Sequence, residues 1–486
     1  MIGLKRFSMV LVALGAAATL SACGGADEVA SPGEGAFNGG TGTPTNPGTG
    51  NPAPGTPAAD CPTGLTNAGV VANGTLRNCQ LPAKITGNLV LPLRSGTVYS
   101  VTGRVDVGDD MGGDPAAPKA GAVKGVLTVD PGVKVFGSAG LDYIVVNRGS
   151  QIFAQGTATQ PIVFTSRQSI EGSTNVDSIG QWGGLVILGR APISNCSGSG
   201  ATPGSATCEA QVEGTNAFYG GNSATDSSGV LRYVRVQHSG FIIVANNELN
   251  GITFAGVGNG TTVDHIQVHN SSDDGIEWFG GTVNAKYLVL TGNDDDSLDT
   301  DVGFNGNIQF VIAVQRANGG NRIVEASSAG TAPRSNPKFA NFTFIGRGGA
   351  GNDAITMNTS TNNVFVNGLV VMTNAAAGCL DIDDATTQGT FNSVRLACAT
   401  PFTEDSNVNA AANATIFNAG TNNSSTHTST LSGTFINGAN ENAVTPFNVT
   451  ALSSFFTAAN YIGAVRDAND TWWQGWTCGL TSGSTC

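Results

Sequence analysis

The chain has 486 residues, of which 68 are glycine, 12 % are charged and 40 % are hydrophobic. Its 22 lysines and arginines stand against 35 aspartates and glutamates, a formal net charge of −13. This balance excludes a nucleic-acid-binding surface, because phosphate contacts need clustered basic side chains and the sequence has no such cluster. The length alone would suggest two or three domains, but a solenoid of stacked coils grows along one axis and remains one domain.

Residues 1–22 have the proportions of a secretory signal peptide. Two basic residues precede an apolar run over residues 9–20, which is too short to span a bilayer. The run ends in LSAC, which resembles the lipobox of bacterial lipoproteins and places Cys23 at the acylated position. The resemblance implies cleavage before Cys23 and acylation of this residue, which anchors the chain to a membrane. Gly24 rather than Asp follows Cys23, which favours the bacterial outer membrane, on its periplasmic or extracellular face.

The segment over residues 23–60 consists mainly of Gly, Pro, Thr, Ser and Asn, with almost nothing to bury. This composition predicts a disordered tether.

The remaining eight cysteines fall into four local pairs. An even number at short separations in an exported chain predicts disulfides, each closing a short loop. The zinc alternative is weak, because no CxxC spacing occurs and the chain has only four histidines. The expected pairs are Cys61 with Cys79, Cys196 with Cys208, Cys379 with Cys398, and Cys478 with Cys486.

Residues 61–450 alternate short Val- and Ile-rich runs with Gly, Asn, Asp and Ser, and one apolar position recurs at intervals of 24, 22, 26, 31 and 25 residues. A parallel β-helix requires such an interval, because each face contributes one strand per coil. The pattern predicts an all-β, right-handed parallel β-helix. The recurring positions are Ile252, Ile276, Leu298, Val324, Ile355 and Leu380.

The runs "GQWGGLVILGRAPI", "GVLRYVRVQHSG" and "NGITFAGVGNGTTVDHIQVHNSSDDGIEWFGG" resemble a family of exported bacterial lipoproteins with a pectate-lyase-like β-helix. The resemblance is strong over residues 122–325 and looser beyond. It implies the fold and carries no established catalytic residues.

The residue after each recurring apolar position is expected to point outward. Coils in such a fold lie about 4.8 Å apart, so like charges in this column repel one another and something must offset the repulsion. The predicted column is Thr253, Glu277, Asp299, Glu325, Thr356 and Asp381.

A bound hard cation is one way to offset the repulsion between these carboxylates. Calcium takes six to eight oxygen ligands in loose geometry, and the turns "SSDDGIEW" and "GNDDDSLDTD" bring more carboxylates to the column. No EF-hand spacing occurs, so the site would be assembled across coils. The candidate ligands are Asp273, Asp274, Asp295, Asp299 and Asp301.

A second explanation for the closely spaced acids is acid catalysis on a polysaccharide. Its candidate catalytic residues are Glu277, Asp299 and Glu325. Paired carboxylates drive their pKa values apart, which leaves one protonated as a general acid. A β-elimination would instead need a basic residue beside calcium, for which Arg322 is the candidate, with Arg316 and Lys286 also near in sequence.

A structural interpretation also stays open, because Asp and Asn cap backbone groups at solenoid turns. It applies best to the turn residues Asp273, Asp274, Asp295 and Asp296 and least well to the column itself.

Residues 451–486 are expected to form a C-terminal cap, with the last disulfide and a tryptophan cluster closing the open end of the solenoid. The alternative for Trp472, Trp473 and Trp476 is stacking on sugar rings. His238, His265 and His269 are interpreted as buried or turn-capping residues rather than metal ligands.

Together these features predict a lipoprotein that binds an extracellular polysaccharide or another surface component through an acidic, calcium-loaded face. A polysaccharide hydrolase or lyase on that face is the first alternative. An adhesin or a structural subunit of an outer-membrane complex is the second.

Overall fold

The structure is a computed structural model that describes residues 55–486 apart from 245–246, 318, 329–331, 349–351, 405–407 and 481–485. The predicted signal peptide, Cys23 and most of the predicted tether lie outside the described residues. The described residues form one compact unit. Within it Ala58 is already buried, and its amide donates to the Gly96 carbonyl at 2.9 Å, so the last residues assigned to the tether contact the solenoid.

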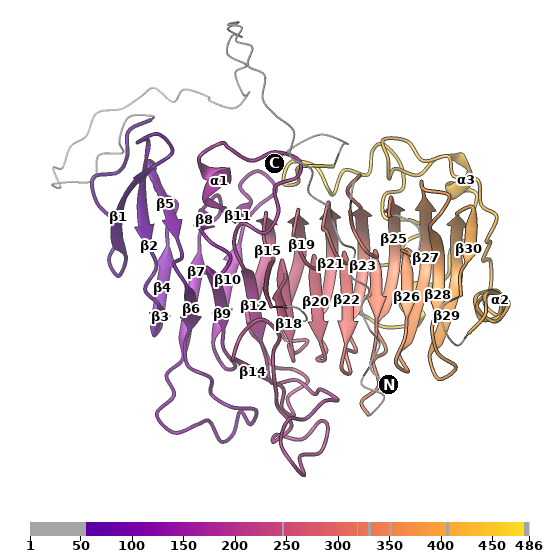
Figure 1. The fold of residues 1–486 in the computed structure, drawn as a ribbon, viewed down its shortest axis with the longest axis horizontal. Helices are drawn as coiled ribbons and strands as arrows, with labels where there is room; N and C mark the ends of the chain where they lie inside the picture. The colour runs from indigo at the N-terminus through magenta and orange to yellow at the C-terminus, as the bar shows by residue number, and fades with distance from the viewer. Residues whose placement is uncertain are drawn as a thin grey trace, which may run out of the picture. The chain divides into compact units, whose positions relative to one another are not determined.

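Two sheets of stacked strands form the body of the protein, which confirms the predicted parallel β-helix (Figure 1). Within these two sheets every strand pair is parallel except that of β1 with β2, which is antiparallel. Sheet A contains 15 strands: β1 (Thr66–Val71), β2 (Leu76–Gln80), β4 (Gly87–Leu91), β5 (Thr97–Ser100), β7 (Gly125–Val129), β8 (Lys134–Gly137), β10 (Gln151–Gln155), β11 (Ile162–Ser166), β15 (Gly229–Gln237), β19 (Thr262–His269), β21 (Asn284–Thr291), β23 (Asn307–Val314), β25 (Lys338–Gly346), β27 (Asn362–Met372) and β29 (Gln388–Ala397).

Sheet B contains 11 shorter strands and carries the predicted acidic column. They are β3 (Lys84–Ile85), β6 (Arg104–Val107), β9 (Tyr143–Val146), β12 (Gly184–Leu188), β18 (Ile252–Ala255), β20 (Ile276–Phe279), β22 (Leu298–Asp301), β24 (Val324–Ala326), β26 (Ile355–Met357), β28 (Gly378–Ile382) and β30 (Thr400–Phe402).

The coils change from three strands to two along the chain. Strand β15 pairs with both β10 and β11, so two short strands of the earlier coil continue as one long strand. At the junction one residue per coil takes a left-handed φ near +55°, which bends the strand without breaking the stack. These residues form a column: Tyr233, His265, Tyr287, Phe310, Asn341, Asn367 and Ser393.

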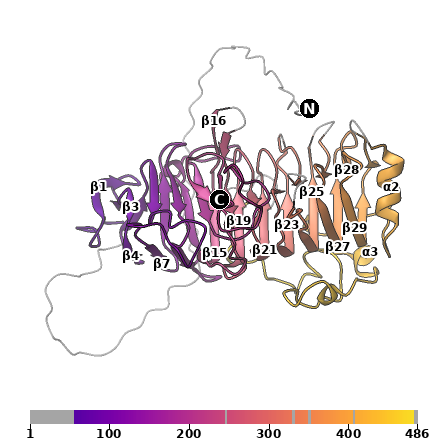
Figure 2. The same cartoon turned by 90° about the horizontal axis from the view of Figure 1, so that it is seen from below.

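Inward-facing apolar side chains fill one continuous core between the sheets. Like residues stack on like, because the parallel register places equivalent positions directly above one another. Phe339, Phe365 and Phe391 stack with ring centroids 4.9 and 5.5 Å apart, and Phe417 of helix α2 (Ala410–Asn418) extends the stack at 5.4 Å. Helix α2 therefore closes the C-terminal end of the solenoid, where it lies beyond β29 and β30 (Figures 1 and 2).

The tryptophan cluster does not close that end, and the predicted cap is corrected on this point. Trp476 lies against Tyr233 and His265, at 5.9 and 5.5 Å between ring centroids, on the outer face of sheet A in the middle of the solenoid. The chain returns along this face after α2, so residues 445–480 form a strap across the coils. The strap includes a 3₁₀ turn over Val449–Ala451.

Amide side chains on sheet A hold the strap by reciprocal hydrogen bonds. Gln309 donates to the Thr457 carbonyl at 2.7 Å and accepts from the Thr457 amide at 2.8 Å. Gln267 makes the same pair of bonds with Cys478, and Asn367 with Phe447. Each amide thus replaces a strand partner for the strap, which satisfies backbone groups that the strap buries.

All four predicted disulfides are present, and they join the pairs expected from the sequence. Three smaller elements lie outside the two sheets. They are the short helices α1 (Arg167–Ile170) and α3 (Ala439–Asn442), and the hairpin of β16 (Phe241–Val244) with β17 (Asn247–Leu249). A second hairpin, β13 (Ala210–Gln211) with β14 (Phe218–Tyr219), belongs to the long connection over residues 190–228, which we call the insert. No helix in the described part of the chain is long and apolar enough to cross a membrane.

Replacing Gln309 with Leu should destabilise the protein, because the variant leaves the Thr457 amide and carbonyl unpaired under the strap. We expect a loss of about 2–5 kcal/mol in the free energy of unfolding, measured by chemical denaturation. The same replacement at the exposed Gln474 is the control and should cost little. Equal effects at both positions would show that the strap does not depend on these hydrogen bonds.

Candidate functional site

The predicted column exists on the outer face of sheet B. Thr253, Glu277, Asp299, Glu325, Thr356 and Asp381 are consecutive partners in the parallel register from β18 to β28. The three candidate acid residues therefore occupy neighbouring coils on one face. Their environments differ along the column, because other parts of the chain cover some coils and leave others open.

The insert covers the beginning of the column. Its apolar side chains, Tyr219 among them, pack on the outward residues of β9, β12 and β18. Glu277 is only 6 % exposed as a result, although it points away from the solenoid core. Oε2 of Glu277 accepts a hydrogen bond from the Asn250 side-chain amide at 2.5 Å.

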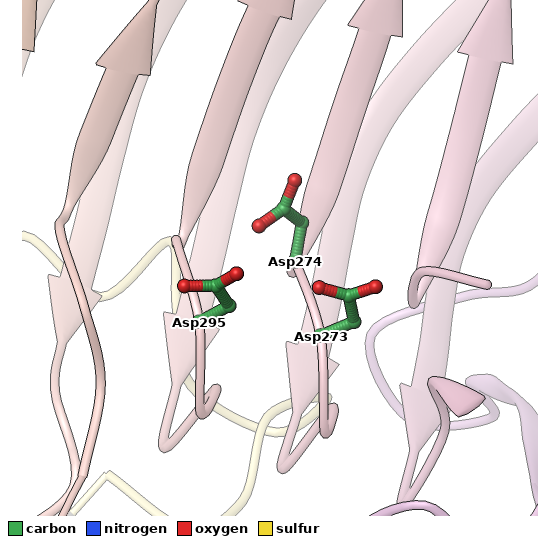
Figure 3. Close-up of side chains that lie close together, drawn as sticks. All are labelled: Asp273, Asp274 and Asp295. Carbon is green, nitrogen blue, oxygen red and sulfur yellow. The ribbon is translucent and has the colours of Figure 1, made fainter. Parts of the chain in front are cut away.

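Two groups of three carboxylates meet at this edge of the insert. One oxygen from each of Asp274, Glu277 and Asp299 lies within 4.8 Å of the others. A second group meets the same limit with Asp273, Asp274 and Asp295, on the turns before β20 and β22 (Figure 3). Asp274 belongs to both groups, so five carboxylates form one continuous acidic cluster.

Burial raises the pKa values of Asp274, Glu277 and Asp299 well above their usual range, and neighbouring carboxylates add to each rise. For Glu277 the principal neighbour is Asp299, and for Asp274 it is Asp296. The physical cause is that ionised carboxylates this close repel one another in a medium that screens poorly. The cluster must therefore hold either shared protons or a cation.

The cluster has the ligand chemistry for a hard divalent cation. All its candidate ligand atoms are oxygens, which is the set that calcium prefers. Oδ1 of Asp299 is shielded from solvent and has no hydrogen-bond donor among the described residues. An acceptor left in this state is costly unless a proton or a cation satisfies it.

The next carboxylate in the column, that of Glu325, is neutralised by a basic residue. Nη1 of Arg322 lies 3.0 Å from Oε2 of Glu325, and its Nε donates to Oγ1 of Thr356 at 2.6 Å. Burial opposes the charged guanidinium, but the carboxylates of Glu325 and Asp296 outweigh it and raise the pKa of Arg322. Arg322 is thus a counter-ion to Glu325, and the direction of this shift is opposite to what a general base needs.

The other basic residues considered from the sequence lie outside the acidic cluster. Arg316 pairs with Asp294 and Asp177, each at 3.2 Å. Lys286 points under the strap on sheet A, with its Nζ 2.8 Å from Oγ1 of Thr457. The structure therefore brings no second basic residue from this set to the cluster.

Asp301, a predicted ligand, belongs to neither group of carboxylates. One of its oxygens accepts from the Val302 amide at 2.5 Å, and burial raises its pKa while a hydrogen bond with Ser327 opposes the rise. The turn interpretation is supported for Asp274 and Asp296. Oδ1 of Asp274 accepts from the Asp296 amide at 3.0 Å, and Oδ1 of Asp296 accepts from the Arg322 amide at 2.7 Å.

The far end of the column is closed by α2. Its buried Asn413 donates to Oδ1 of Asp381 at 3.1 Å. The histidines lie apart from the column. His269 is buried against Thr291, burial lowers its pKa to about 3, and His238 contacts the Ser178 carbonyl at 2.7 Å. His238 and His269 are therefore buried as expected, whereas His265 is partly exposed and stacks between Tyr233 and Tyr287.

Two residues that contribute to the acidic cluster were not among the sites predicted from the sequence. Asn250 stands two residues before Ile252, as Asp274 stands two before Ile276, so the same alignment held a signal for it. Glu213 adds to the rise in the pKa of Glu277 and comes from the insert. No periodic signal marks the insert, because it is not a repeating coil.

Comparison with protein families gives one match. Residues 117–477 match the model of a pectate-lyase-like beta helix domain, which covers most of the chain and extends past the segment where the resemblance was strong. Comparisons with curated proteins and with solved structures give no match.

The raised pKa values predict an unusual pH dependence in calcium-free buffer. A carboxyl whose folded pKa exceeds its unfolded value of about 4 stabilises the fold below that value and loses this contribution as the pH rises. Asp299→Asn cannot ionise, so its Tm should fall less than that of the unsubstituted chain between about pH 4 and pH 8.

The lowered pKa of His269 makes the fold more stable as the pH rises. This contribution is the same in the variant and the unsubstituted chain, so it cancels when their curves of Tm against pH are compared. Asp114→Asn, outside both groups, is the control and should follow the unsubstituted chain. Identical slopes for all three proteins would show that Asp299 does not carry the repulsion.

Proposed function

This chain belongs to the family of pectate-lyase-like β-helix proteins, and on that premise we propose that it binds an extracellular polysaccharide through a divalent cation held in its acidic cluster. Calcium fits the oxygen-only ligand set and tolerates irregular coordination better than magnesium, which demands near-ideal octahedral geometry. The family relationship is compatible with polysaccharide binding and with polysaccharide cleavage. The choice between them rests on the residues of the site.

The observation that carries the proposal is the number of ligands. Each group offers three carboxylates, whereas calcium takes six to eight oxygen atoms. Positions left open on the cation can be completed by hydroxyl or carboxylate oxygens of a glycan. A bound calcium would supply positive charge and open coordination positions. The chain's own residues supply the remainder: Asp274 joins the two groups, and Asn250 orients Glu277.

One observation favours cleavage as the second candidate function. The raised pKa of Glu277 keeps its carboxyl protonated at a pH where an ordinary glutamate is ionised, which is what a general acid requires. Glu325, two coils along the column, would be its partner across a distance of about 10 Å, at the upper limit for inverting enzymes. Arg322 holds Glu325 in place.

Calcium should raise the Tm of the full chain relative to chelator, because a ligand that binds only the folded state stabilises it by about 2.7 kcal/mol at a hundredfold excess over Kd. Asp299→Asn and Asp274→Asn should lose most of this rise. Asp301→Asn should keep it, because Asp301 lies outside both groups.

The same proteins should be tested for retention on immobilised polygalacturonate. We expect retention in calcium that chelator and Asp299→Asn abolish. Release of new reducing ends or unsaturated products, lost in Glu277→Gln, would identify an enzyme instead. A Tm and a retention that do not respond to calcium would refute the cation-mediated proposal.

We further propose that the protein is lipid-anchored at Cys23 and works at the outer membrane, which the LSAC sequence and the apolar run before it support. In a Gram-negative host the full chain should incorporate labelled fatty acid and sediment with the outer membrane. Cys23→Ser should do neither, and Cys61→Ser, which removes a cysteine elsewhere, should still be labelled. Labelling of the Cys23→Ser variant would contradict the anchor.

A further inference from the structure

A hollow opens on the outer face of sheet B at its N-terminal coils. Its walls come from β3, β6, the connection after β6, and the insert, and they include Lys84, Arg104, Asp106, Asp109, Asn216 and Phe218. The inward residues Ile85, Val105 and Val107 are buried in the core, so the polar residues alternating with them point outward. The insert packs on the coils between this hollow and the acidic cluster, and so borders both.

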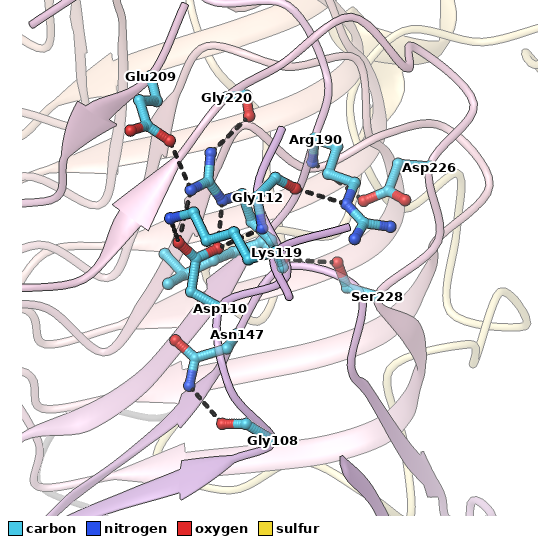
Figure 4. Close-up of polar contacts among 12 residues, drawn as sticks. Gly108, Asp110, Gly112, Lys119, Asn147, Arg190, Glu209, Gly220, Asp226 and Ser228 are labelled. Atoms are coloured by element: carbon cyan, nitrogen blue, oxygen red, sulfur yellow. Dashed lines mark hydrogen bonds and ion pairs between the residues drawn. The ribbon is translucent and has the colours of Figure 1, made fainter. Parts of the chain in front are cut away.

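A buried ionic network fixes the walls of the hollow (Figure 4). Asp110 binds the fully buried Arg148 through two contacts of 2.6 Å, and Lys119 reaches Asp110 at 2.5 Å. Arg148 also pairs with Glu209 of the insert at 2.7 Å and donates to the Gly220 carbonyl at 3.0 Å. The connection after β6 and the insert are thereby fastened to one coil, so the hollow is formed in advance of any ligand.

The charges lining the hollow neutralise one another. Lys84 pairs with Asp109 and Arg104 with Asp106, each at 2.6 Å, and Arg104 also donates to Oδ1 of Asn216 at 2.5 Å. Asp110 also lines the hollow, and Arg148 and Lys119 offset its charge, so the lining has little excess charge to attract a polyanion or a metal ion. The Arg104 guanidinium already makes four hydrogen bonds, but the carboxylates keep free acceptor positions, because a carboxylate has about four lone-pair sites.

Phe218 supplies an apolar surface beside these polar groups. It is half-buried at the start of β14, and Nζ of Lys119 lies 5.9 Å from its ring centroid. Directional polar groups next to an aromatic ring match a sugar, which presents hydroxyls at its edge and C–H groups on its faces.

We propose that this hollow is a saccharide subsite that takes one neutral sugar unit, independent of calcium. The inference extends the proposed function, on which it rests for the class of ligand. Four strand spacings separate β6 from β20, a distance of about 19 Å, so one polysaccharide could engage the hollow and the acidic cluster together across the insert. Two weak sites on one chain would then act with increased avidity.

The test uses the full chain in chelator, run by affinity electrophoresis through gels that contain a mixed-linkage β-glucan, a xylan or a galactomannan. At least one gel should retard the unsubstituted protein. Asn216→Ala and Phe218→Ala should weaken that retardation at least fivefold. Leu93→Ala, which removes an exposed apolar side chain outside the hollow, should not change it.

Asn216 is exposed, so its replacement reports on binding even where Phe218→Ala lowers stability, and a Tm measurement separates the two effects. Retardation that is absent on all three glycans, or unchanged in both variants, would overturn the subsite. The calcium response and the polygalacturonate retention should persist in both variants. Their loss in Asp299→Asn but not in Asn216→Ala separates failure of the subsite from failure of the cation-mediated proposal.

Discussion

The parallel hydrogen-bond ladder between coils is the constraint on which the rest of this structure depends. It holds equivalent residues of successive coils about 4.8 Å apart, so any chemical feature that recurs in the sequence becomes a column in space. Columns that face inward consist of stacked apolar side chains such as Phe339, Phe365 and Phe391. Facing outward, it places Glu277, Asp299 and Glu325 side by side.

A column of like charges cannot be relieved by moving the residues apart, because the ladder fixes their spacing. The chain meets this constraint in three ways along one column. Arg322 neutralises Glu325 by an ion pair, and Asn413 of α2 donates to Asp381. Glu277 and Asp299 have hydrogen bonds from the Asn250 side chain and the Thr300 backbone, but neither carboxylate forms an ion pair with a basic side chain among the described residues. This is the point at which an external cation or a retained proton has the most to contribute, which is why we place the function there.

The outer faces of both sheets are partly covered, and the coverings shape what remains accessible. The strap lies on sheet A, where Gln267, Gln309 and Asn367 bind its backbone as a neighbouring strand would. The insert lies on sheet B and divides its face into the acidic cluster and the N-terminal hollow. Both candidate binding regions therefore owe their boundaries to segments that are not part of the repeating coils.

Spacing along the chain was enough to predict the repeat, and with it the fold, the register of the six column residues and the four disulfides. Ile252 to Leu380 could be aligned by interval alone, and the ladder then had to place Glu277 above Asp299. Which charges are buried, paired or left together depends on contacts that form only in the folded chain. The burial of Glu277 depends on the insert, and the place of Trp476 depends on a strap that returns more than 200 residues to Tyr233. Such contacts join a repeating coil to a segment that does not repeat, so the local sequence pattern of one segment does not predict its contact with the other.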